Sequence, residues 1–230
     1  MPPPEPPQTL LPAVGVTPWP IQYGPTRMRL TAAYQRAHRG PDAVTGDDDA
    51  DSRMVPRMIV LHWTASGYAR STWFTFDPER RPRRPDLNDA KALNLSTHFL
   101  VDRDGTIYQL MDETRIGRHV IGLNHVAIGV ENVGDGQRYP MTDAQVQANV
   151  ALVQYLVARY ESITHLIGHY EYQQFERSAH PYFHDIESKR SQKIDPGAEF
   201  MRAVRQKTLI SGLEGAPSID TCDNSSRPSP

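Results

Sequence analysis

The stretch that most constrains the fold of this chain is Met58-Ile59-Val60-Leu61-His62-Trp63, in which an apolar run leads into a histidine, His62. A short continuous run rich in β-branched residues predicts a buried strand. Strand ends hold side chains rigidly and leave them accessible, so a histidine there can belong to a functional site. A single histidine beside a strand is more often a hydrogen-bonded core or rim residue. A function for His62 therefore depends on partners elsewhere in the chain.

A second histidine, His169, ends a similar run that begins at Ile163. Two imidazoles and one carboxylate form the three-ligand zinc site of hydrolases, which keeps a fourth position for water. Asp195, in Lys193-Ile194-Asp195-Pro196-Gly197, is the candidate carboxylate, because the Pro-Gly turn would stiffen the backbone that presents it. Spacing alone leaves an equal alternative, in which Asp195 caps a helix that starts with the following proline.

Composition divides the chain into three parts. Residues 1–54 form a Pro-rich and acidic arm, in which ten of the twenty prolines of the chain fall in the first 41 residues. Proline removes a backbone donor and fixes φ, so residues 1–27 are predicted to be extended, as a spacer or as a strap over the domain. Residues 55–208 carry strand and helix patterns and form one domain. Residues 209–230 are a small, polar tail.

Strand and helix patterns alternate within the domain. Asp104-Gly105 between two alternating runs is a strong hairpin signal. Thr142 and Gln145 form a capping box at the start of the most regular helix. Residues 67–87 are rich in arginine, proline and aromatic residues and are predicted to be an irregular insertion. Residues 170–192 are polar and aromatic, show no clear period, and form a second insert. The predicted strands are 57–64, 97–101, 106–110, 127–133 and 163–169, and the predicted helices are 31–38, 88–93, 142–160 and 195–207. The fold class is therefore α/β, with a mixed central sheet flanked by helices.

Charge and cysteine content argue against several classes of protein. Twenty-five basic and 27 acidic residues give a net charge of -2, so the chain lacks the excess positive charge that is typical of nucleic-acid-binding proteins. The single cysteine, Cys222, permits neither a disulfide within the chain nor a thiolate metal site. The sequence contains no run of 18 apolar residues, so no membrane-spanning helix is predicted. The first residues do not form a signal peptide, and whether a leader has been removed is left open.

Five short segments occur in order along residues 55–205: Ile59 to Ala65, Ser96 to Gln109, Asn124 to Glu131, Ile167 to His169, and Lys193 to Phe200. Together they resemble the zinc-dependent N-acetylmuramoyl-L-alanine amidases of type 2. That family also includes phage lysozyme-type amidases and peptidoglycan recognition proteins. The resemblance implies the family's single-domain fold, a mixed sheet flanked by helices, and one bound Zn²⁺.

The resemblance also implies a role for each matching residue. His62, His169 and Asp195 would be the zinc ligands. Glu131 matches the catalytic glutamate of the family, which orients or deprotonates the attacking water. Lys193 would stabilise the negative charge that develops on the carbonyl oxygen. The alternatives are that Glu131 is an exposed strand charge and that Lys193 is an ordinary surface lysine.

Two further positions match residues of the family's substrate groove. His119 would contact the substrate, and Asn124 would bind it from the following loop. His98 matches a family histidine to which we assign a structural role or a role beside the metal ligands. Some members carry a catalytic tyrosine where this chain has Thr97, so that variant of the mechanism is not expected here.

The connection between His169 and Lys193 is longer than is usual in the family, which leaves the register of the third ligand open. His180 and His184 lie within it as alternative ligands, although the proline between them argues against a helical histidine pair. Together with residues 67–87, this insert is predicted to wall a long groove.

The leading interpretation is an enzyme that hydrolyses the amide between N-acetylmuramic acid and L-alanine, in peptidoglycan or its muropeptide fragments. The rival class is a non-catalytic peptidoglycan-binding module, whose members lack a metal ligand. A third possibility is a zinc hydrolase that acts on another amide, since a fold does not fix its substrate. The Pro-rich arm favours the cell envelope, periplasmic or secreted, over the cytoplasm. The sequence leaves the oligomeric state open.

Overall fold

A six-stranded sheet forms the centre of the molecule, which is known from a computed structural model that describes residues 14–44, 52–84 and 86–218. The strand order is β1-β4-β3-β5-β2-β6. Only β3 and β4 pair antiparallel, and the other neighbours pair parallel, so the predicted mixed sheet is confirmed. The strands are β1 (Val16–Pro18), β2 (Met58–Trp63), β3 (Phe99–Val101), β4 (Ile107–Gln109), β5 (Ala127–Asn132) and β6 (His165–Gly168).

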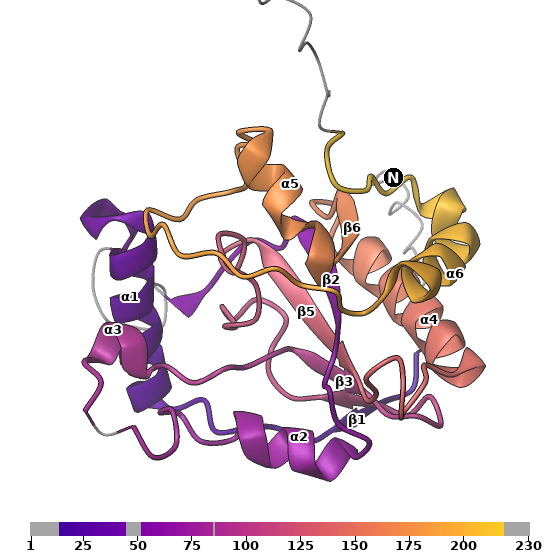
Figure 1. The fold of residues 1–230 in the computed structure, drawn as a ribbon, viewed down its shortest axis with the longest axis horizontal. Helices are drawn as coiled ribbons and strands as arrows, with labels where there is room; N and C mark the ends of the chain where they lie inside the picture. Colours follow the sequence, from indigo (N-terminus) through magenta and orange to yellow (C-terminus); the bar gives the residue numbers. More distant parts are fainter. Residues whose placement is uncertain (1–13, 45–51, 85, 219–230) are drawn as a thin grey trace, which may run out of the picture.

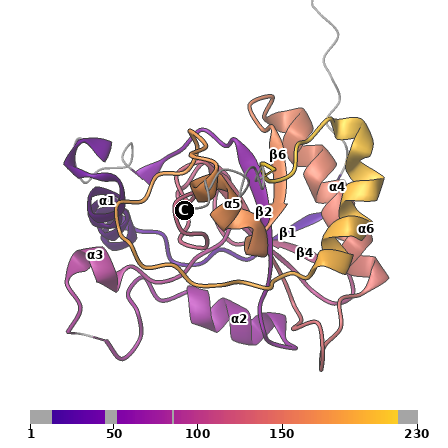
Figure 2. The same cartoon turned by 45° about the horizontal axis from the view of Figure 1, so that its top comes forward.

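Helices surround this sheet on several sides (Figure 1). They are α1 (Pro25–Arg39), α2 (Ala69–Phe76), α3 (Asp89–Ala92), α4 (Asp143–Arg159), α5 (Tyr172–Arg177) and α6 (Ala198–Thr208). Short 3-10 turns lie at η1 (Pro41–Ala43), η3 (His169–Glu171) and η4 (Leu209–Ser211). The helices α4 and α6 lie side by side, whereas α1 and α3 pack together at the opposite end of the molecule (Figure 2).

The side chains of β2 alternate between two apolar clusters, one on each face of the sheet. Ile59 and Leu61 pack in the large apolar cluster that includes Leu152 of α4 and Val204 of α6. Met58 and Val60 point to the other face, into a second cluster with loop 120–127 and α5. Because successive side chains of a strand point to opposite faces, His62 lies on the same face as Val60. The predicted buried strand is confirmed, and its histidine lies on the face opposite α4 and α6.

The described part of residues 1–54 packs against the domain. β1 extends the sheet by pairing with β4, and α1 buries Leu30 and Tyr34 against α3 and its flanks. The fully buried Arg27 donates through Nη2 to the backbone carbonyls of residues 76, 77 and 78. The helix also begins at Pro25, six residues before the predicted start, because proline is well tolerated in the first turn.

Two predicted insertions contain helices. α2 lies within 67–87 and buries Ala69, Thr72 and Phe76 at helical spacing, a signal that the surrounding arginines and prolines obscured. α5 lies within 170–192, and from it the chain runs irregularly to α1 and back across the front of the sheet to α6 (Figure 1). The predicted hairpin and the helix from Thr142 are confirmed, including the capping box with Gln145.

Candidate functional site

Three neighbouring strands bring the candidate site together. β5, β2 and β6 are parallel and adjacent, and His62 is directly opposite Glu131 in the register of β2 and β5. Leu61 pairs with Gly168, so His169 follows β6 at the level of His62. In open α/β sheets, ligands bind beyond the carboxyl ends of the strands. The carboxyl ends of these three strands therefore bring together two imidazoles, from His62 and His169, and the carboxylate of Glu131.

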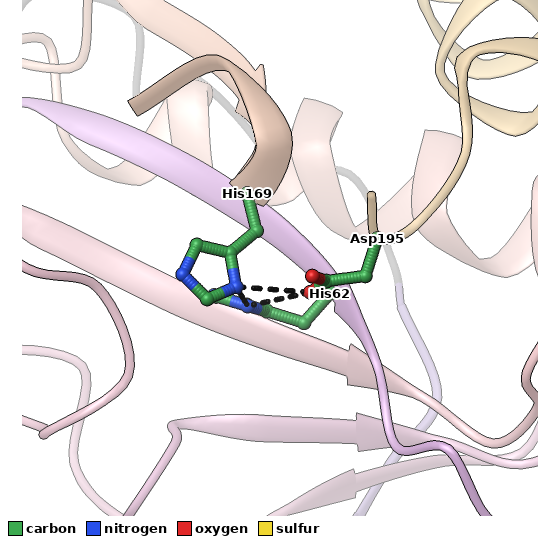
Figure 3. Close-up of side chains that lie close together, drawn as sticks. All are labelled: His62, His169 and Asp195. Carbon is green, nitrogen blue, oxygen red and sulfur yellow. Dashed lines mark hydrogen bonds and ion pairs between the residues drawn. The ribbon is translucent and has the colours of Figure 1, made fainter. Parts of the chain in front are cut away.

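His62, His169 and Asp195 point toward one another, and their ligand atoms lie within 4.8 Å of one another (Figure 3). The Nδ1 atoms of the two histidines are 3.0 Å apart. Oδ2 of Asp195 lies 3.0 Å from Nδ1 of His169 and 3.3 Å from Nδ1 of His62. All three side chains are largely buried. The three predicted ligands thus form one compact group.

The loop before α6 brings Asp195 to this group. The backbone N–H of Tyr170 donates to the carbonyl of Asp195 at 3.1 Å, which ties this loop to the turn that carries His169. That turn is itself anchored by Glu171, which accepts from the N–H of Gly168 and pairs with Arg205 of α6. Asp195 does not cap α6, which begins at Ala198 with Gly197 as its N-cap. The capping alternative is therefore wrong.

The donor set fits a zinc ion. A tetrahedral ion with ligand bonds of about 2.0–2.2 Å separates its ligand atoms by about 3.3–3.5 Å, close to the triangle formed by His62, His169 and Asp195. Burial, and then the charge of His62, lower the pKa of His169 to about 4, so this imidazole is neutral as a metal ligand must be. Burial opposes ionisation of Asp195, but the interactions of its carboxylate with the rings of His169 and His62 outweigh burial and hold the pKa of Asp195 well below its usual range.

Glu131 and Lys193 line the cavity above this group, which has a volume of about 590 Å³. The Oε2 atom of Glu131 is buried and has no hydrogen-bond partner among the described residues. Burial, and then the nearby charge of Asp195, raise the pKa of Glu131 well above its usual range, while Lys193 acts in the opposite direction. A buried carboxyl that lines a cavity and has a raised pKa is suited to proton transfer.

His119 and Asn124 lie near the group but make contacts within the protein. Nδ1 of His119 is 3.0 Å from Nε2 of His62, and its Nε2 is 3.1 Å from the carbonyl of Ala127. Both ring nitrogens are therefore engaged, although the ring lines the cavity. Asn124 accepts from the N–H groups of His119 and Val120, and it donates to the hydroxyl of Tyr34 on α1. The predicted substrate contacts of these two residues stay predictions.

The other predicted histidines lie apart from this group. His98 is fully buried, accepts from the N–H of Gly129 at 2.9 Å, and donates through Nε2 to the carbonyl of Arg115 at 2.7 Å. Burial lowers the pKa of His98 to about 4, so it holds the hairpin in place as a neutral ring. His180 packs on Phe175, and neither it nor His184 joins a group of possible metal ligands in the described part of the chain.

A second cavity of about 420 Å³ adjoins the first and shares five lining residues with it: Leu95, Arg118, His119, His169 and Lys193. α2 lines the first cavity, whereas α1, α3 and the insert after α5 line the second. Tyr34 and His38 of α1 were not predicted to lie here. Their segment shows no motif, and only the tertiary fold brings them to the groove. The predicted groove along the insert and residues 67–87 is confirmed in outline.

Comparison with known proteins places the chain in context. The family described as N-acetylmuramoyl-L-alanine amidase matches residues 52–198. The endolysin of Escherichia phage T7 is 38% identical over 84 residues, 34% of this chain and 55% of that protein. The endolysin of Klebsiella phage KP32 is 34% identical over 124 residues, 52% of this chain and 78% of that protein. Peptidoglycan recognition protein 3 of Mus musculus is 32% identical over 73 residues, 32% of this chain and 21% of that protein.

The matches to the endolysins of phage T7 and Enterobacteria phage T3 span 55% and 49% of those proteins, about half their length. Among solved structures, the amidase LysC from Clostridium intestinale URNW has a TM-score of 0.47 at 22% identity, and the alignment covers 70% of this chain and 88% of that chain. Within residues 14–44, 52–84 and 86–218, no helix combines the length and apolar character needed to cross a membrane.

Proposed function

The chain belongs to the N-acetylmuramoyl-L-alanine amidase family, and we propose that it hydrolyses the amide between N-acetylmuramic acid and L-alanine with the help of one zinc ion. The observation that carries this proposal is the set of three buried ligand atoms from His62, His169 and Asp195, with Glu131 beside them in the same cavity. A zinc ion bound there would polarise the scissile carbonyl and acidify water.

Glu131 is the proposed general base. It lies on β5 directly opposite His62, and its buried Oε2 has no hydrogen-bond partner within the described part of the chain. In the proposed reaction, Glu131 takes a proton from the attacking water as the new C–O bond forms. It then returns a proton to the leaving amine of L-alanine as the C–N bond breaks. A carboxyl with a raised pKa can serve both steps near neutral pH.

Lys193 is the proposed stabiliser of the carbonyl oxygen. It lies two residues before Asp195, and both side chains line the same cavity. Its ammonium group adds positive charge where the oxygen becomes negative, and this acts most strongly in a site shielded from water. His119 and Asn124 are proposed to border the substrate, His119 through the edge of its ring and Asn124 through the loop that it holds.

The proposed substrate is peptidoglycan or a soluble muropeptide. Two adjoining cavities that share His119, His169 and Lys193 make a groove that extends in both directions from the candidate metal site. A bond within an extended chain needs such a groove, because sugar and peptide lie on opposite sides of the amide. We propose that residues 55–208 carry the catalytic residues, that β1 and α1 of the arm (residues 1–54) complete the sheet and the groove, and that residues 209–230 are a tail. We also propose that the enzyme works in the cell envelope, periplasmic or secreted.

The test is digestion of purified muropeptides, with mass spectrometry of the products. The proposal predicts release of an intact stem peptide with a free L-alanine amino group, together with the peptide-free sugar. Cleavage between sugars or within the peptide would contradict it. Binding of muropeptides without any release would support the rival class, a peptidoglycan-binding module.

A further inference from the structure

A chain of contacts runs from the sheet to the candidate metal site through His119. The carbonyl of Ala127 is 3.1 Å from Nε2 of His119, and Nδ1 of His119 is 3.0 Å from Nε2 of His62. On the other side of the His62 ring, Nδ1 faces His169 at 3.0 Å and Asp195 at 3.3 Å. Both nitrogens of His62 therefore have a defined partner.

The chemistry of these groups fixes where the protons lie. A carbonyl only accepts hydrogen bonds, so Nε2 of His119 must carry a proton and donate it to Ala127. In a neutral imidazole the other nitrogen is then an acceptor, so Nδ1 of His119 accepts from Nε2–H of His62. A neutral His62 with its proton on Nε2 has its lone pair on Nδ1, the atom that faces His169 and Asp195.

The backbone around His119 is built to hold its ring in this position. Gly129 of β5 lies under the ring, and a Cβ at that position would come within 2.8 Å of Cγ and Nδ1 of His119. Asn124 accepts from the N–H of His119 at 2.9 Å and so holds the backbone of the loop. The rings of His119 and His62 meet edge to face at 88°, with centroids 5.1 Å apart.

We propose that His119 is a positioning residue that keeps the proton of His62 on Nε2 and thereby presents Nδ1 as a metal ligand. The hydrogen bond also fixes the orientation of the His62 ring, because it joins the ring to the carbonyl of Ala127 on the neighbouring strand. This role differs from a substrate contact. It rests on the proposed metal site, and it needs no property of the substrate.

The test measures zinc affinity by competition with a chromophoric chelator. Loss of the partner that orients a metal-binding histidine costs about 10–100-fold in metal affinity, and we expect a weakening of that size in His119→Ala. His119→Asn should recover much of the loss, because the amide oxygen of asparagine can take the place of Nδ1 as an acceptor. The matched control is His184→Ala, which removes an imidazole from the insert and should bind zinc like the wild type.

A second measurement reads the tautomer directly, through two-bond 1H–15N correlations of the histidine rings in the zinc-loaded wild type. The proposal predicts a proton on Nε2 of His62 and zinc on Nδ1. Ligation through Nε2 would overturn it, even if His119→Ala does not fold. Unchanged zinc affinity in folded His119→Ala would also overturn it and leave the proposed function standing. A wild type that binds no zinc would overturn both.

Discussion

The candidate metal site has two halves that differ in how the chain holds them. His62 and Glu131 lie on central, parallel strands that are buried and hydrogen-bonded on both sides. Lys193 and Asp195 lie on an irregular segment that reaches the site only after a detour to α1 (Figure 1). The strand half is fixed by the sheet, whereas the segment half depends on a few side-chain contacts. The rigid strands therefore position His62 and Glu131, and the irregular segment completes the site by adding Lys193 and Asp195.

Removal of a zinc ligand has the largest expected effect, and it should be the same in both halves. His62→Ala and Asp195→Ala should each lose stoichiometric zinc and activity, because two remaining ligands do not make a stable zinc site. Elemental analysis and muropeptide hydrolysis measure these losses, and circular dichroism checks the fold. Glu161→Gln, an exposed carboxylate that lines neither cavity, is the control. Full zinc content in either alanine variant would contradict the ligand set.

Glu131→Gln tests the strand half without touching a ligand. We expect zinc content to stay at the wild-type level while kcat falls by about 10²–10⁴-fold, the usual contribution of a general acid or base. Glutamine keeps the size of the side chain but cannot accept the proton. The control is Glu199→Gln on the exposed first turn of α6. Wild-type turnover in Glu131→Gln would remove the proposed base.

Lys193→Ala tests the segment half in the same way. The loss of one group that stabilises a developing oxyanion costs about 10²–10³-fold in kcat, so the effect should be smaller than that of Glu131→Gln. KM and zinc content should change little. Steady-state kinetics against Lys207→Ala, an exposed lysine in the last turn of α6, provides the comparison. An effect confined to KM would instead indicate a binding role.

A pH titration of stability tests the contribution of His98, whose ring accepts a hydrogen bond from Gly129 on the strand that carries Glu131. The pKa of buried His98 is lowered to about 4 from 6.5, so the unfolded chain binds this proton first as the pH falls. Stability from this group is therefore complete above about pH 6.5 and declines toward pH 4, by about 2 kcal/mol between pH 8 and pH 5. Urea unfolding of the wild type and His98→Asn at both pH values measures it. An equal pH dependence in the two proteins would exclude His98 as the cause.

The smallest expected effect concerns the anchorage of the segment. Arg190 pairs with Glu176 of α5 at 2.7 Å and is largely buried, whereas Glu176 is about one-third exposed. Such pairs contribute about 0.2–1 kcal/mol, so Arg190→Gln should weaken zinc binding by at most about fivefold. Chelator competition measures the change. A loss as large as that of Asp195→Ala would show that the segment, and not the strands, controls the site.

The strand half could largely be predicted from the sequence. The runs that end at His62 and His169 have the apolar pattern of buried strands, and parallel pairing then brings their ends together. The capping box at Thr142 likewise marks the start of α4. Local patterns of this kind are sufficient because the strand period and the helix cap depend on neighbouring residues only.

The segment half depends on contacts between distant parts of the chain. Asp195 has the same local sequence whether it caps a helix or joins two histidines, and only the resemblance to a family favoured the second role. The link between His119 and His62 spans 57 residues and leaves no periodic trace in the sequence. The contribution of α1 to the groove was missed for the same reason, since Tyr34 reaches Asn124 across 90 residues.

Dependence of catalysis on zinc is measured by muropeptide hydrolysis before chelation, after removal of the chelated metal, and after zinc is returned. If zinc is the catalytic metal, stem-peptide release stops when zinc is removed and returns in step with one zinc ion per chain. The Asp195→Ala protein should stay inactive throughout. Release at the wild-type rate from protein shown by elemental analysis to contain no metal would exclude a zinc-dependent mechanism.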